Sequence, residues 1–260
     1  MFIIKKTRIF HPNKTAIQVT VFTPDYKNKK TPLVIMLTGD GPKGSKSLTW
    51  SNLAEKLSTQ GIATLLFDFS GLGDSDGLRA NLTLTQGIAD FELVFKYVQT
   101  LNYIDKKNIG ILASSFGASV ALNCYNIINS VKALGLKSPC CFLPDAYINE
   151  ISEHSLEEWV NTNYCRENQY NLNVLLDPFS YNTYESAKKI DTPCLITHGV
   201  EDKIVPISQS NYLNILLKCR HEFKMFHNCD HGYTTADNWD KMAAVFVQFF
   251  TQELIGDFND

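Results

Sequence analysis

Short apolar runs alternating with helix-like stretches constrain the fold of this chain more than any other feature. Six strand-like runs are expected, at residues 33–37, 62–69, 109–113, 131–136, 194–197 and 222–226. Most are almost continuous Val, Ile and Leu, and a strand with no polar face is typical of a sheet covered by helices on both sides. The pattern therefore predicts an α/β fold built on a parallel sheet.

Two further strands precede these runs and have a different pattern. Residues 3–10 and 17–22 alternate polar and apolar side chains, as antiparallel strands with one solvated face do. The complete prediction is a mostly parallel, eight-stranded sheet. Helices are expected at residues 48–60, 85–101, 116–128, 208–217 and 237–254.

One segment is too long for a crossover loop. More than fifty residues separate the strand that ends near Lys137 from the strand that begins at Cys194. We expect residues 140–187 to form a small helical cap over the sheet edge, between two parts of the α/β core at 1–139 and 188–260. Its eight aromatic residues are expected either to line a substrate pocket or only to anchor the insertion in place.

Composition excludes several classes of protein. The 260 residues carry 24 Lys and Arg against 27 Asp and Glu. The chain therefore lacks the excess positive charge that is typical of proteins that bind nucleic acid or anionic membranes. No apolar run is long enough for a transmembrane segment, and no export signal is present, which predicts a cytoplasmic protein. The seven irregularly spaced cysteines fit reduced thiols and no metal site. The oligomeric state is left open.

The most informative motif is a serine at a predicted strand-to-helix junction. Ser115 is flanked two residues away by Ala113 and Gly117, the small neighbours that a sharp, strained turn requires. Such a turn presents the hydroxyl at the carboxyl edge of the sheet, next to helix amides that could stabilise negative charge. Ser114 has bulkier neighbours and is the poorer candidate. Both serines could instead merely cap the helix.

The chain resembles the α/β-hydrolase family in two features: this A-S-S-F-G motif, where the family usually has G-x-S-x-G, and the order of its predicted strands. It is most similar to small capped bacterial esterases of the cinnamoyl or feruloyl type and to the monoglyceride-lipase and serine-aminopeptidase branch. The resemblance implies an acid and then a histidine later in the chain.

Both expected partners follow the serine in that order. Asp202 occupies the acid position of a G-x-x-D-x-x-V-P pattern, with Glu201 as a solvent-directed neighbour. His231 precedes a glycine after the last strand and is the expected base, with His227 as the alternative. His198 is expected to pack or to orient its loop. Ser115, Asp202 and His231 would meet at one sheet edge, where ligands of open α/β sheets bind.

The oxyanion hole departs from the family pattern. Thr38-Gly39-Asp40-Gly41 stands where the family usually has His-Gly-x-Gly, and the amides of Asp40 and Phe116 are the expected donors. The Asp40 carboxylate would oppose a nearby alkoxide unless it points away. The same loop does not match a phosphate-binding loop. That motif requires Lys and then Ser or Thr after its second glycine, whereas here the order is reversed, and Pro42 lacks an amide that would bind phosphate.

These motifs predict a serine hydrolase that cleaves carboxylic esters through an acyl-enzyme, with a small-molecule ester or acyl substrate and no cofactor. A peptidase or thioesterase on the same triad is the first alternative, because fold and triad do not select the leaving group. A catalytically silent hydrolase fold that only binds ligands is the second.

Overall fold

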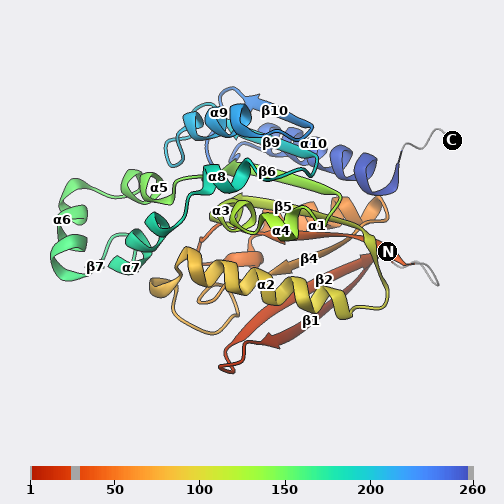
Figure 1. The fold of residues 1–260 in the computed structure, drawn as a ribbon, viewed down its shortest axis with the longest axis horizontal. Coiled ribbons are helices and arrows are strands. Elements are labelled where there is room, and N and C mark those ends of the chain that lie inside the picture. The colour runs from red at the N-terminus through yellow and green to blue at the C-terminus, as the bar shows by residue number, and fades with distance from the viewer. Residues whose placement is uncertain (1, 25–29, 257–260) are drawn as a thin grey trace.

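A computed structural model describes residues 2–24 and 30–256, and an eight-stranded sheet forms its centre (Figure 1). The strand order is β1-β2-β4-β3-β5-β6-β9-β10, antiparallel at β1–β2 and β2–β4 and parallel elsewhere. The strands are β1 (Phe2–Phe10), β2 (Ala16–Pro24), β3 (Thr31–Leu37), β4 (Ala63–Phe67), β5 (Ile104–Ser115), β6 (Ala133–Pro139), β9 (Cys194–Gly199) and β10 (His221–Phe226). The α/β prediction, with its eight strands, is confirmed.

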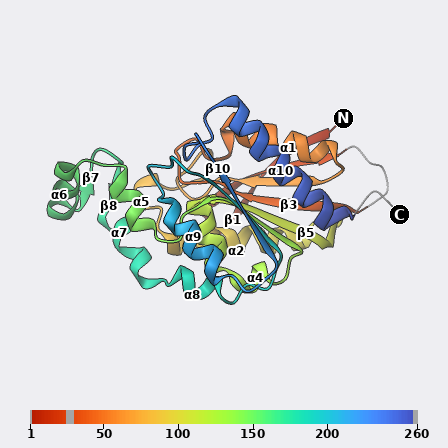
Figure 2. The same ribbon diagram turned by 90° about the horizontal axis from the view of Figure 1, so that it is seen from above.

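Helices cover both faces of this sheet (Figure 2). One face carries α1 (Leu48–Thr59) and α10 (Ala236–Ile255), and the other carries α2 (Leu84–Thr100), α3 (Phe116–Asn123) and α9 (Ile207–Leu216). Because side chains alternate along a strand, Leu112 packs toward α10, whereas Ile111 and Ala113 pack toward α2 and α3. Each face thus has its own buried layer.

The helix expected at residues 116–128 is split in two. It ends at Asn123, and a short α4 (Tyr125–Ile128) follows. The Asn123 side chain donates hydrogen bonds of 2.9 Å to the Ser119 carbonyl and to the Thr183 hydroxyl. Side-chain bonds of this kind compete with the regular helix ladder, which explains a break that periodicity alone does not predict.

The segment between β6 and β9 folds as a separate group of short elements at the carboxyl edge of the sheet (Figure 1). It contains α5 (Leu143–Asn149), α6 (Glu153–Thr162), the paired β7 (Tyr164–Cys165) and β8 (Tyr170–Asn171), α7 (Leu172–Leu176), η3 (Asp177–Ser180) and α8 (Thr183–Ala187). We call this segment, residues 140–187, the insertion. Its interior is aromatic: Trp159 stacks on Tyr170 at 6.4 Å between ring centroids, and Tyr147 lies 5.4 Å from Tyr170.

The loops that carry the expected site residues leave the carboxyl ends of β3, β5, β9 and β10, so the parallel strands bring them to one edge. Among the described helices, none combines the length and the apolar character that a membrane span requires.

Candidate active site

Ser115 ends β5 in a strained backbone conformation, and α3 begins at the next residue. Its φ of 51° and ψ of −117° lie in a region that a residue with a Cβ rarely adopts, at a cost of about 1–3 kcal/mol. The turn is held by the end of β3, since the Gly117 amide donates to the Thr38 carbonyl at 3.1 Å. A Cβ at Gly117 would lie only 2.5 Å from that oxygen, so no larger residue fits there without movement.

His231 and Asp202 form a close pair on the loops after β10 and β9. Nδ1 of His231 lies 2.6 Å from Oδ2 of Asp202. Oδ1 of Asp202 accepts 2.9 Å hydrogen bonds from the amides of Ile204 and Val205, which fix the carboxylate in its loop. The expected acid and base are therefore brought together, with the carboxylate on the ring nitrogen that orients the imidazole.

The Asp202 side chain is fully buried, and its charge is stabilised by several donors. Burial alone would raise its pKa, but hydrogen bonds from His198 and His231, the positive charge of His231 and the Val205 amide outweigh that effect. The pKa of Asp202 is therefore held well below its usual range, so the carboxylate stays ionised at every pH at which the protein would work.

The other candidates for base and acid lie outside this pair. His198 is buried, with Nδ1 2.6 Å from the Ser210 hydroxyl and Nε2 3.0 Å from both the Val205 carbonyl and Oδ2 of Asp202, so it contacts the acid and its loop without lining the pocket. Glu201 and His227 are exposed and line no part of the pocket described below.

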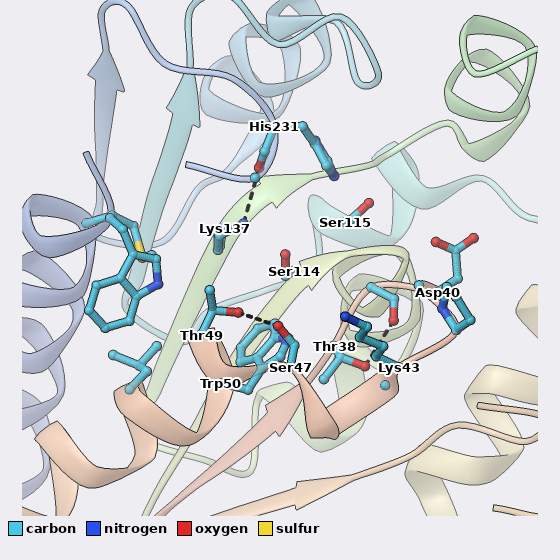
Figure 3. A pocket seen from close by; sticks show the side chains of 18 of the residues that line it. Thr38, Asp40, Lys43, Ser47, Thr49, Trp50, Ser114, Ser115, Lys137 and His231 are labelled. Carbon is cyan, nitrogen blue, oxygen red and sulfur yellow. Dashed lines mark hydrogen bonds between the residues drawn. The ribbon is translucent and has the colours of Figure 1, made fainter. Parts of the chain in front are cut away.

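Ser115 and His231 line one pocket of about 510 Å³ (Figure 3). The His231 ring is directed into this pocket on the side of Ser115. Within the described chain the Ser115 hydroxyl forms no hydrogen bond to His231, and such contacts are often long until a substrate is bound.

The Thr38–Gly41 loop lies directly beside Ser115. A Cβ built on Gly39 would be 3.4 Å from the Ser115 Cβ. The Thr38 hydroxyl donates to the Gly39 carbonyl at 2.9 Å, so this threonine braces the loop where the related family has histidine. Among the turn and loop hydrogen bonds of the described residues, none is donated by the Asp40 amide or the Phe116 amide.

The Asp40 side chain is held by the insertion. Its Oδ2 accepts a 2.6 Å hydrogen bond from the Tyr170 hydroxyl, and its backbone carbonyl accepts one of 2.9 Å from Nε of Arg79. Arg79, in η2 (Arg79–Asn81), also lies over the Tyr170 ring at 4.2 Å and donates to the Asn168 carbonyl at 2.6 Å. The Asp40 carboxylate therefore has a hydrogen-bond donor in the insertion, whereas its backbone carbonyl is bound by Arg79.

The pocket wall comes from the core rather than from the aromatic residues of the insertion. Trp50 and Leu53 of α1 and Trp239 and Met242 of α10 provide its apolar part. The expectation that insertion aromatics line the pocket is wrong for its described wall, because Tyr147, Trp159 and Tyr170 pack against one another. The insertion contributes Glu150 alone.

Two charged residues of the pocket have shifted pKa values. Partial desolvation and the nearby Asp40 charge raise the pKa of Glu150 to about 7, and the positive charge of Arg79 opposes this rise. Burial lowers the pKa of Lys137, near the end of β6, to about 8. Sequence reasoning missed Lys137, although a lysine in the apolar run of β6 was a visible signal.

The described residues hold no cluster of three or more His, Cys, Asp or Glu that could bind a metal ion.

The sheet order and the strand-to-helix serine define an α/β hydrolase. The chain belongs to the prolyl oligopeptidase family, whose family model matches residues 57–256. The predicted resemblance to α/β hydrolases is thereby confirmed.

Solved structures agree on the fold. Est1E from Butyrivibrio proteoclasticus, in a structure with ferulic acid, aligns with a TM-score of 0.81 and 22% identity over 96% of this chain and 100% of that chain.

Two curated relatives match this chain over only part of their own length. The quorum-quenching protein AidA of Acinetobacter baumannii is 31% identical over 35% of this chain, and the acylamino-acid-releasing enzyme of Mus musculus is 25% identical over 76% of it. The matches span only 30% and 27% of those two proteins.

Proposed function

We propose that this chain is a serine hydrolase that cleaves carboxylic esters, with Ser115 as nucleophile, His231 as base and Asp202 as the orienting acid. One observation carries the proposal: a serine in a strained strand-to-helix turn opens on the same pocket as a histidine paired at 2.6 Å with a buried, ionised carboxylate. That combination is what an activated hydroxyl requires.

In the proposed reaction Oγ of Ser115 attacks the ester carbonyl carbon while Nε2 of His231 takes the hydroxyl proton. The Asp40 and Phe116 amides stabilise the oxyanion. Collapse of the tetrahedral intermediate breaks the C–O bond, and His231 returns its proton to the departing alcohol. Water then attacks the acyl-enzyme with His231 again as base, releasing the acid and restoring Ser115.

We further propose that the insertion acts as a cap. Its contacts with the site support this role, because Tyr170 holds the Asp40 side chain and Glu150 reaches the pocket. Loops and insertions at the carboxyl edge of a parallel sheet commonly control access to it.

A peptidase is the second candidate. Glu150 and Asp40 both line the pocket, and their carboxylates would suit a substrate with a free amino group. The membership in a family named for an oligopeptidase favours the same reading.

A fluorophosphonate probe tests the serine chemistry directly. We expect an adduct on the wild type and none on Ser115→Ala, whereas Ser114→Ala should still label. His231→Ala should lower both labelling and hydrolysis of 4-nitrophenyl acetate by at least about 1,000-fold. Equal labelling of wild type and Ser115→Ala would refute the assignment. No adduct on any folded variant would favour the silent binder.

Parallel rates on ester, thioester and aminoacyl-amide substrates then separate the candidates. The ester assignment requires the largest kcat/KM for the oxygen ester after correction for intrinsic reactivity. A preference for aminoacyl amides would instead support the peptidase.

A further inference from the structure

Lys137 is an unusual residue for its place in the sheet. It lies near the carboxyl end of β6, where the four preceding residues are buried and apolar. It pairs in parallel register with Ser114 of β5, and both residues line the pocket. Since register partners point to the same face, the lysine side chain lies on the side covered by α1 and α10.

The protein provides few hydrogen-bond partners for the Lys137 ammonium group. Nζ donates one hydrogen bond of 3.2 Å to the His231 carbonyl (Figure 3). It also lies 4.8 Å from the centre of the Tyr233 ring. An ammonium has three donors. Throughout residues 2–24 and 30–256 no carboxylate comes within 4 Å of it, and the nearby Asp202 and Asp230 already accept from His231 and Thr234.

The surroundings make an unpaired charge costly. Trp50 and Leu53 approach from α1, and Trp239 and Met242 from α10, so this end of the pocket is mainly apolar. Lys137 itself is only partly buried, and a cation held beside apolar side chains is stabilised by an anion that reaches it. The substrate is the only component of the proposed reaction that can bring one.

We propose that Lys137 forms an anion subsite, and that the substrate carries a carboxylate on a short apolar arm lying between α1 and α10. This inference rests on the proposed function and names its substrate class. The pocket wall also includes Asp40 and Glu150, which would repel an anion, and a second lysine, Lys43, which lies beside Asp40 (Figure 3).

A purely structural role must be separated from this one. The hydroxyl of Ser138 also lies 3.3 Å from the His231 carbonyl, so Lys137 could serve only to hold the histidine loop. In that case its removal would slow every substrate alike. An anion subsite instead predicts a loss confined to anionic substrates.

Two pairs of substrates that differ only in a carboxylate distinguish an anion subsite from a structural role of Lys137. Mono-4-nitrophenyl adipate against 4-nitrophenyl hexanoate places the charge on the acyl side, and 4-acetoxybenzoate against its methyl ester places it on the alcohol side. Lys137→Met removes the charge but keeps an apolar stem, Lys137→Arg keeps the charge, and Lys132→Met alters an exposed lysine outside the pocket.

In one of the two pairs we expect Lys137→Met to lower the ratio of kcat/KM for the anionic over the neutral ester by about 10- to 100-fold. Lys137→Arg should retain most of the ratio and Lys132→Met all of it. An equal loss for both members of both pairs, or an unchanged ratio, would overturn the proposal.

A binding measurement tests the anion subsite independently of catalysis. If no ester reacted, that result would count against the proposed function but not against the subsite. Monomethyl adipate should quench the tryptophan fluorescence of Ser115→Ala and bind at least about tenfold more weakly to Ser115→Ala/Lys137→Met. Equal affinity in the two folded variants would contradict an anion subsite whatever the chemistry at Ser115.

Discussion

The Tyr170 hydroxyl donates a 2.6 Å hydrogen bond to the Asp40 carboxylate, joining the insertion to the loop beside Ser115 across 130 residues of chain. The bond gives the carboxylate a fixed partner. In the proposed mechanism this bond would hold the Asp40 carboxylate in place and limit its approach to the charge that develops at the oxyanion.

Tyr170→Phe tests this relationship. Without its donor the Asp40 carboxylate is free to approach the oxyanion, so we expect kcat to fall about tenfold with little change in KM. Tyr164→Phe, in the same hairpin but exposed, should have no effect. Steady-state kinetics on 4-nitrophenyl acetate measure both variants.

A second substitution separates charge from packing. If the free carboxylate causes the loss, Asp40→Asn in the Tyr170→Phe background should restore much of kcat. A double variant as slow as Tyr170→Phe would show instead that the tyrosine acts by supporting the loop.

Asp202→Asn should remove the orientation of His231. We expect kcat to fall by about 1,000- to 10,000-fold, because an amide can hold the imidazole in the wrong tautomer. Glu201→Gln changes the neighbouring exposed carboxylate and serves as the matched control. A loss below tenfold in Asp202→Asn would exclude Asp202 as the orienting acid.

The same carboxylate makes stability depend on pH. A folded-state pKa below the unfolded value of about 3.9 means that its contribution to the free energy of unfolding is complete above that value and is lost as the pH falls through the folded pKa. The wild type should therefore lose stability more steeply than Asp202→Asn below about pH 4, as urea unfolding at several pH values would measure. Parallel pH curves would contradict the link.

The preference for anionic substrates should itself depend on pH. Burial lowers the pKa of Lys137 to about 8 against the opposing effects of Asp202, Cys229 and Asp230. The ammonium loses its charge above that value, whereas an alkyl carboxylate stays ionised. The ratio of kcat/KM for the anionic over the neutral ester should fall between pH 7 and pH 9.5, and the titration of His231 cancels in this ratio.

The control is Lys137→Arg, whose guanidinium stays charged over this range, so its ratio should stay level. A ratio that falls equally in both proteins would assign the change to another group.

Gly117→Ala should destabilise the fold. Its Cβ would lie 2.5 Å from the Thr38 carbonyl oxygen, and overpacking of this kind costs about 1–3 kcal/mol. Gly41→Ala is the matched control in the adjoining loop, because no atom lies within 4 Å of the added Cβ. Urea denaturation gives the difference, and equal midpoints would contradict the close approach of the two segments.

Local chemistry explains why some features were predictable. The small residues around Ser115 identify the turn, and apolar strands identify the sheet. Asp202 and His231 follow their strands directly, so parallel topology predicts that their loops share an edge. The roles of these three residues remain predictions that the experiments above test.

Features that depend on distant packing escaped prediction. Nothing near Asp40 indicates that Tyr170 binds its carboxylate, because the partner comes from an insertion whose fold is set by its own aromatic interior. Trp50 and Trp239 line one pocket because α1 and α10 cover the same sheet face. Periodicity identified both helices but not which side chains would form the pocket wall.

The division of labour within the pocket has a consequence for how such a protein can diversify. Its apolar wall belongs to helices that cover the central sheet, whereas the insertion supplies one carboxylate to the pocket and a hydrogen bond to the loop beside Ser115. If the insertion acts as the proposed cap, exchanging its short helices would change which molecules reach Ser115 and would leave the apolar wall unaltered. Substrate choice could then evolve by changes in the insertion without a cost to the stability of the sheet.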